Sequence, residues 1–211
     1  AARLQDPACR LLTLVGPGGI GKTRLALAAA QQLLDTSFWL LDTTPAPALQ
    51  ALKAKSQNPH FPDGVFFVPL ADVLTADWLA TTIASVLHFT LFRRDEEPLQ
   101  QLAHYLADKR LLLVLDNFEH LVAGAGLVTT LLAQAPGLKV LTTSRERLNL
   151  QGEWLLEVPG LLYAQAGSVT QMAECSAVQL FVQSARRVKA DFHLDEQNKA
   201  AVARICSLVE G

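Results

Sequence analysis

One glycine-rich stretch constrains the fold of this chain more than any other feature. Residues 16–23 read Gly-Pro-Gly-Gly-Ile-Gly-Lys-Thr, a complete match to the pattern G-x-x-x-x-G-K-[ST]. The apolar run at 11–15 predicts a buried strand before it, and residues 24–34 predict a helix after it. A glycine loop between a strand and a helix is the context in which this pattern binds the phosphates of a nucleotide.

The residue types of the loop fit the wrapping of a polyphosphate. Its glycines let successive backbone N–H groups approach the phosphates closely. Lys22 adds a mobile cation for the outer phosphates, and Thr23 offers its hydroxyl to Mg²⁺. The alternative is a glycine turn that carries Lys-Thr by chance. The predicted nucleotide-binding residues are Gly16, Pro17, Gly18, Gly19, Ile20, Gly21, Lys22, Thr23 and Arg24.

A second informative feature is the apolar run at 111–115, which ends in Asp116. A buried parallel strand of this kind places its terminal carboxylate at the carboxyl edge of the sheet, where open α/β folds bind ligands. Asp116 can therefore hold Mg²⁺ together with Thr23. The alternative is an aspartate that only caps a helix at 121–133.

The residues after Asp116 bear on hydrolysis. Asn117 cannot take a proton from water, so the nearest acid that could orient a nucleophilic water is Glu119. An equally open interpretation is that Glu119 only favours the dipole of the following helix.

Strand and helix patterns alternate along the chain, which predicts an α/β fold with a parallel sheet and right-handed crossovers. The predicted strands are 11–15, 65–68, 111–115, 138–142 and 153–158, with helices near 75–89 and 98–107 between them. Residues 35–64 lose this periodicity and carry four prolines, so we interpret them as a surface insertion with a short helix around 48–53.

Strand patterns stop near the carboxyl end of the sequence, where helices are predicted at 177–188 and 196–209. We therefore expect a nucleotide-binding domain over 1–165 and the start of a truncated helical subdomain over 176–211.

The amino-acid composition bears on whether the protein binds a membrane or a nucleic acid. Half of the 211 residues are hydrophobic, which suits a buried parallel sheet, yet no apolar run is long enough to cross a bilayer. The net charge is −2 and the basic residues are scattered, unlike a nucleic-acid footprint. Three widely spaced cysteines favour buried thiols in a reducing compartment. We expect a cytoplasmic protein whose nucleotide domain contacts neither membrane nor nucleic acid.

Several stretches together resemble the STAND class of P-loop NTPases, in particular the NB-ARC/AP-ATPase branch and bacterial regulators of the AfsR and LuxR type. They are LLTLVGPGGIGKTRLALAAA (11–30), FPDGVFFVPLADV (61–73), LLLVLDNFEHL (111–121), KVLTTSRERLNLQGEWLLEVPGL (139–161) and SAVQLFVQSARRV (176–188). The resemblance implies a three-layer αβα fold with a five-stranded, mainly parallel sheet in the order 5-1-4-3-2. It also implies a switch operated by ATP, ADP and Mg²⁺.

The resemblance carries roles to individual residues. Lys22 and Thr23 would serve phosphate and Mg²⁺, Asp116 would be the Walker B acid, and Arg145 would be the sensor near the γ-phosphate. An alternative for Arg145 is an exposed charged turn with a surface ion pair. The expected catalytic residues are Lys22, Asp116, Glu119 and Arg145, and the expected metal ligands are Thr23 and Asp116.

The sequence also departs from the family pattern. No Gly-Arg-Glu segment precedes the first strand, and the family's Gly-Leu-Pro-Leu motif would start at Gly211. We therefore expect a fragment of a longer signal sensor or transcriptional regulator, with effector and sensor domains outside it, slow ATP hydrolysis and nucleotide-dependent self-association. The alternative is a work-performing AAA+-type ATPase, although such enzymes normally carry a glutamate where Asn117 stands.

Overall fold

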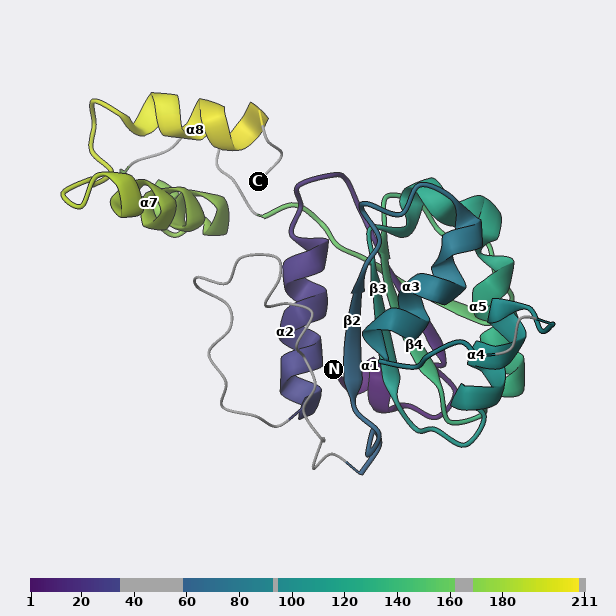
Figure 1. Ribbon diagram of the computed structural model, residues 1–211. Coiled ribbons are helices and arrows are strands. Elements are labelled where there is room, and N and C mark those ends of the chain that lie inside the picture. The colour runs from purple at the N-terminus through teal and green to yellow at the C-terminus, as the bar shows by residue number, and fades with distance from the viewer. Residues whose placement is uncertain (35–58, 93–94, 162–168, 209–211) are drawn as a thin grey trace. The chain divides into compact units, whose positions relative to one another are not determined.

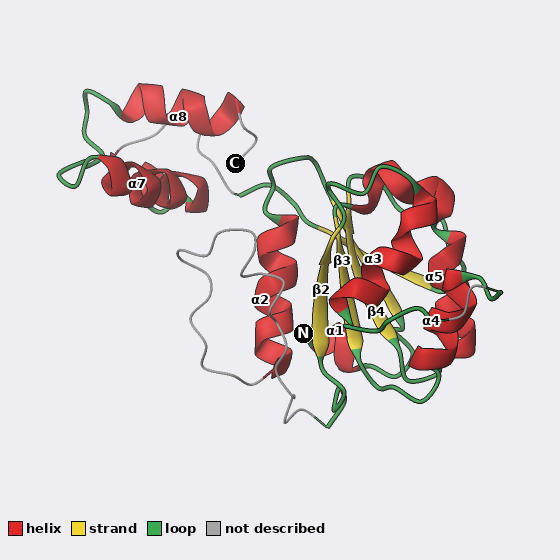
Figure 2. Cartoon of the chain, in the orientation of Figure 1, coloured by secondary structure: helices red, strands yellow, loops and turns green. Residues whose placement is uncertain are grey.

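The computed structural model describes residues 1–34, 59–92, 95–161 and 169–208, and they divide into two units, Ala1–Glu157 and Val158–Gly211. The first unit is built on a five-stranded sheet (Figures 1 and 2). Its strands are β1 (Leu11–Val15), β2 (Val65–Pro69), β3 (Leu112–Asp116), β4 (Lys139–Ser144) and β5 (Glu153–Glu157). The predicted short helix at 48–53 lies outside the described residues.

All neighbouring strands of the sheet are parallel, in the order β2-β3-β4-β1-β5. This is the predicted order 5-1-4-3-2 read from the other edge, so the predicted fold class is confirmed. The register pairs Val15 with Ser144 and Pro69 with Asp116, and the carboxyl ends of the strands therefore meet at one edge.

Helices cover both faces of the sheet, which gives three layers (Figure 1). One face packs against α2, and the other packs against α3, α4 and α5. The helical segments of this unit are α1 (Ala2–Gln5), α2 (Lys22–Leu34), η2 (Ala76–Trp78), α3 (Leu79–Val86), α4 (Pro98–Leu106), η3 (Phe118–Gly124) and α5 (Gly126–Gln134), where η marks a 3-10 helix. The core between the sheet and α3–α5 is built from leucine, valine and alanine side chains, with Phe118 fully buried.

The helix predicted at 121–133 is instead two segments, η3 and α5. Gly124 explains where the break falls, because a Cβ at this position would lie 2.3 Å from the Cβ of Ala76 in η2. Only glycine allows η3 and η2 to approach this closely, and glycine is a weak former of regular helix. The break thus follows from a contact between segments far apart in the sequence.

A chain of side-chain hydrogen bonds links three neighbouring strands, β4, β1 and β5. The Oγ1 of Thr142 donates to Oγ1 of Thr13 (2.8 Å), and Oγ1 of Thr13 donates to Oε1 of Glu153 (2.6 Å). The same carboxylate oxygen accepts a bond from the backbone N–H of Leu148 (2.9 Å). These bonds satisfy buried hydroxyls and fix the loop that follows Arg145.

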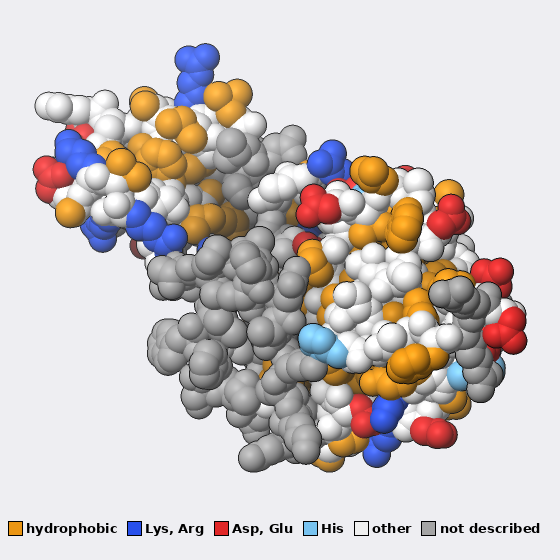
Figure 3. All heavy atoms as spheres, in the orientation of Figure 1, with side chains coloured by type: hydrophobic (Ala, Val, Ile, Leu, Met, Phe, Trp, Pro, Cys, Tyr) orange, Lys and Arg blue, Asp and Glu red, His pale blue; other side chains and the backbone are white. Residues whose placement is uncertain are grey.

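The second unit contains three helices among its described residues, α6 (Val169–Ala173), α7 (Ser176–Val188) and α8 (Lys199–Leu208). The predicted α7 and α8 are present, whereas α6 was missed. Their shared core includes Met172, Val178, Val202 and Cys206. In the view of Figure 3, apolar side chains gather in the middle of this unit with Lys and Arg side chains around them, and the first unit shows acidic, basic and apolar side chains interspersed.

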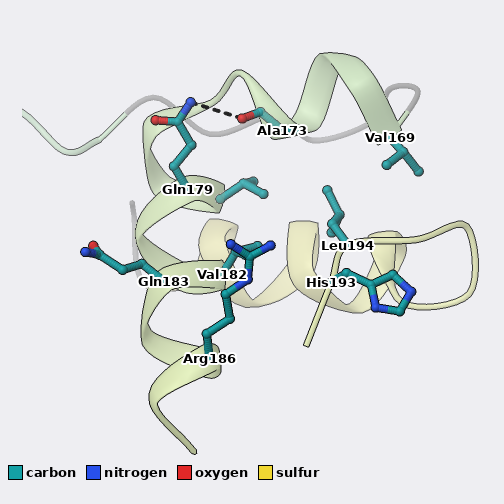
Figure 4. A pocket seen from close by; sticks show the side chains of 9 residues that line it. Val169, Ala173, Gln179, Val182, Gln183, Arg186, His193 and Leu194 are labelled. Atoms are coloured by element: carbon teal, nitrogen blue, oxygen red, sulfur yellow. Dashed lines mark hydrogen bonds between the residues drawn. The ribbon is translucent and has the colours of Figure 1, made fainter. Parts of the chain in front are cut away.

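A cavity of ≈ 490 Å³ lies in the second unit (Figure 4). It is lined by Val169, Ala173, Val178, Gln179, Val182, Gln183, Arg186, His193 and Leu194. None of the predicted site residues is among them. Across both units, no described helix combines the length and the apolar character needed to span a membrane.

Candidate nucleotide-binding site

The glycine loop joins β1 to α2 at the carboxyl edge of the sheet, as predicted. Gly19 (φ +82°) and Gly21 (φ +92°) adopt the left-handed region that favours glycine. Lys22 is the first residue of α2, and its Nζ donates to the carbonyl oxygens of Gly16 and Pro17, each at 2.8 Å. Lys22 is only 9% exposed, and its ammonium closes the loop from inside. Its role as a cation for the outer phosphates stays a prediction.

The start of α2 points its positive end at this loop. The first helical bond runs from the N–H of Leu25 to the carbonyl oxygen of Gly21 (2.9 Å), and amides of the first turn have no partner within a helix. Pro17, Gly18 and Gly19 are exposed, and so are Thr23 and Arg24, whereas Ile20 is half-buried. The loop backbone is thus open to a phosphate.

Asp116 and Thr23 lie together, as the sequence predicted. The Oγ1 of Thr23 donates to Oδ1 of Asp116 at 2.8 Å. Thr143, at the carboxyl end of β4, donates to the same oxygen at 2.6 Å and accepts a bond from the backbone N–H of Asn117 at 2.9 Å. Hydroxyl and carboxylate oxygens are the hard ligands that Mg²⁺ prefers, and these two lie close enough together to hold one ion.

Asn117 turns the chain sharply after β3. Its left-handed conformation (φ 67°, ψ 52°) is uncommon for residues other than glycine, but asparagine tolerates it. The buried Phe118 then anchors η3 in the core, and Glu119 follows in the first turn of η3. This turn brings Glu119 close to the loop that follows β4.

Arg145 and Glu119 form an ion pair beside the glycine loop. The Nε of Arg145 lies 3.1 Å from Oε1 of Glu119, with side-chain exposures of 67% and 18%. The other carboxylate oxygen of Glu119, Oε2, is buried without a hydrogen-bond partner among the described residues. The guanidinium of Arg145 also lies against Gly18, where a Cβ would be 3.3 Å from Nη2 and 3.4 Å from Cζ.

The structure therefore gathers Lys22, Thr23, Asp116, Glu119 and Arg145 at one edge of the sheet. Their functional roles stay predictions, as does the alternative of a surface ion pair for Arg145. The sequence analysis gave no role to Thr143, which is 2% exposed and binds both Asp116 and Asn117. The signal that could have found it is its place directly after the strand predicted at 138–142, which the resemblance puts between the Lys22 and Asp116 strands.

Relatives of this chain are longer proteins. A Mycobacterium bovis protein, provisionally named an HTH-type transcriptional regulator, is 34% identical over 205 residues, which cover 96% of this chain and 19% of that protein. An uncharacterized Mycobacterium tuberculosis protein is 32% identical over 203 residues, which cover 96% of this chain and 43% of that protein. This chain thus spans less than half the length of either relative.

A solved structure and a family profile define the fold class. The ADP form of the Aeropyrum pernix ORC2 protein matches with a TM-score of 0.50 at 16% identity, covering 93% of this chain and 50% of that one. That likeness concerns the fold alone. The AAA domain family matches residues 5–153, which include the glycine loop, Asp116, Glu119 and Arg145. This chain belongs to the AAA domain family and carries an AAA-type P-loop ATPase domain.

Proposed function

We propose that the first unit is the ATP/ADP-binding switch domain of a signalling NTPase of the STAND class, NB-ARC branch, within a transcriptional regulator or signal sensor. The observation that carries this proposal is the position of Arg145. It lies against Gly18 of the glycine loop and is bonded to Glu119, which follows the Asp116 strand. This position supports the proposal because a cation beside the glycine loop would be able to contact the last phosphate of a nucleotide bound there.

The residues of the site divide the binding task. Backbone amides of the glycine loop and of the first turn of α2 would hold the phosphates. Lys22 uses two of its three ammonium donors on the loop carbonyls, which leaves the third for a phosphate oxygen. Thr23 and Asp116 would hold Mg²⁺, which neutralises phosphate charge when bound.

Arg145 would distinguish ATP from ADP. A guanidinium presents a fork of donors that matches the oxygens of a terminal phosphate, and only ATP places a γ-phosphate there. Because a nucleotide shifts a conformational equilibrium only through differential contacts, such a residue is what a switch requires.

Hydrolysis should be slow for two reasons. Asn117 offers an amide where a glutamate could take a proton, and the carboxylate of Glu119 is shared with Arg145. The free Oε2 of Glu119 still has unused acceptor capacity, which suits orientation of an attacking water. A switch tolerates slow turnover because the bound state itself is the signal.

The relatives extend well beyond the matched region, and one is provisionally named a transcriptional regulator. We propose that a helical subdomain starting at 176 follows the nucleotide domain over 1–165, that effector and sensor domains lie elsewhere in a cytoplasmic protein, and that nucleotide controls self-association.

Calorimetric titration of wild type and Arg145→Ala with Mg²⁺-ATP and Mg²⁺-ADP tests the proposal. Arg145→Ala should weaken ATP relative to ADP by about 10- to 100-fold, because the lost charge-assisted bonds are made only to ATP. Equal losses for both nucleotides, or none, would remove Arg145 as the sensor. Steady turnover on the order of 1–100 s⁻¹ would contradict a slow switch and favour a work-performing ATPase.

A further inference from the structure

We propose that Glu119 is a positioning residue that competes with the terminal phosphate of ATP for Arg145, and thereby limits how strongly the site prefers ATP over ADP. This inference rests on the proposed function and concerns the regulation of the same site. Its basis is the ion pair of 3.1 Å between Nε of Arg145 and Oε1 of Glu119.

The guanidinium of Arg145 lies against the glycine loop at Gly18. Gly19 and Gly21 need glycine for their positive φ angles, whereas Gly18 does not share that conformation. What a side chain at position 18 would meet first is the guanidinium of Arg145, at 3.3–3.5 Å. A side chain at position 18 would therefore crowd the guanidinium of Arg145, and no positive φ accounts for the glycine there.

The two partners differ in how firmly they are held. Glu119 is 18% exposed and belongs to η3, which is fixed by the buried Phe118 and by the close approach of Gly124 to Ala76. The neighbouring His120 adds a contact of 2.8 Å between its Nε2 and the carbonyl oxygen of Val73. Arg145 is 67% exposed, so in an exchange of partners Arg145 moves and Glu119 stays.

An exchange of partners has a measurable cost. A γ-phosphate gains the guanidinium only if Arg145 gives up its bond to Glu119, so ATP affinity is reduced by the strength of that bond. For a pair this exposed, the reduction should be about two- to fivefold. ADP presents no γ-phosphate and leaves the pair intact, so ADP affinity carries no such reduction.

The test is a double-mutant cycle measured by calorimetry with Mg²⁺-ATP and Mg²⁺-ADP. Glu119→Gln keeps the size of the side chain and removes its charge, so ATP should bind about two- to fivefold more tightly while ADP is unchanged. In an Arg145→Ala background, Glu119→Gln should no longer raise the affinity for ATP, because there is no guanidinium for Glu119 to hold back from the phosphate. Glu146→Gln is the matched control, since it removes an exposed acid one residue from Arg145, whereas the described ion pair of Arg145 is with Glu119. This variant should leave both affinities unchanged.

The outcomes separate this inference from the proposed function. If wild type binds ATP but Glu119→Gln changes nothing, or strengthens ATP and ADP equally, or keeps its gain in the Arg145→Ala background, the competition is overturned and the switch function stands. If wild type binds neither nucleotide, both fall. Should Glu119→Gln fail to fold, Glu119→Asp withdraws the carboxylate by one methylene and should give a smaller gain in the same direction.

A measurement without nucleotide tests the pair itself. The same cycle in urea-induced unfolding should show coupling of about two- to fivefold in the unfolding equilibrium constant between Glu119→Gln and Arg145→Ala. Strictly additive effects would show that Glu119 does not hold Arg145, and would overturn the inference whatever the nucleotide titrations gave.

Discussion

The hydroxyl of Thr143 should be essential for the stability of the site, and Thr143→Val tests this with little change in side-chain shape. The hydroxyl donates to Asp116 at 2.6 Å and accepts from the N–H of Asn117 at 2.9 Å, in a position that is 2% exposed. Removing it loses a hydrogen bond to a carboxylate, about 1.5–3 kcal/mol, and leaves the Asn117 N–H without this acceptor, about 1–3 kcal/mol. Because the two effects overlap, we expect a total loss of about 2–4 kcal/mol in the free energy of unfolding.

Urea-induced unfolding followed by tryptophan fluorescence measures this loss in the right part of the chain. All three tryptophans, at 39, 78 and 154, belong to the first unit, so the signal reports on that unit alone. Thr142→Val is the matched control, because Thr142 is equally buried but donates to the neutral hydroxyl of Thr13. It should lose only about 1 kcal/mol. Equal losses in the two variants, with unchanged Mg²⁺-dependent ATP affinity in Thr143→Val, would refute the reasoning.

Three further outcomes are expected. Gly21→Ala should lose about 1–2 kcal/mol in the free energy of unfolding, because φ is +92° at this position. Gly126→Ala is the control, since a Cβ there meets open space and φ is not positive, and it should not be destabilised. Equal effects of the two substitutions would contradict the role of the loop backbone. Glu119→Gln should reduce single-turnover hydrolysis by about 100-fold or more if Glu119 orients water, and wild-type rates would remove it from the mechanism. Burial, with a smaller contribution from the nearby Cys175, raises the pKa of the Cys206 thiol above its ordinary value of 9.0, so the folded second unit retains a proton that the unfolded chain loses. The stability of that unit, followed by circular dichroism, should therefore fall as the pH rises above about 9, and Cys206→Ala should reduce the fall.

The sequence predicted most of the fold because its signals are local. The apolar runs at 11–15 and 111–115 are buried strands in the structure, and the glycine loop lies between β1 and α2. The order of the strands came from the family resemblance rather than from periodicity, since periodicity does not say which strands are neighbours. Both predictions agree with the observed sheet.

What the sequence could not supply depends on contacts between distant segments. The break between η3 and α5 follows from the contact of Gly124 with Ala76. The pairing of Glu119 with Arg145 depends on the left-handed turn at Asn117, a conformation that no local pattern requires. The bonds of the Lys22 ammonium to the carbonyl oxygens of Gly16 and Pro17 likewise depend on how the loop folds back, which no local pattern shows.

The most direct test of the account is the affinity of Lys22→Ala for Mg²⁺-ATP, measured by calorimetry beside wild type. The substitution removes the cation that bonds to the carbonyls of Gly16 and Pro17 and that would contact the phosphates, so affinity should fall by about 10- to 100-fold. Lys109→Ala is the control, because Lys109 lies near Asp63 (3.9 Å), away from the glycine loop in the sequence, and should bind like wild type. Wild-type affinity in Lys22→Ala would contradict the assignment of the glycine loop as the nucleotide site.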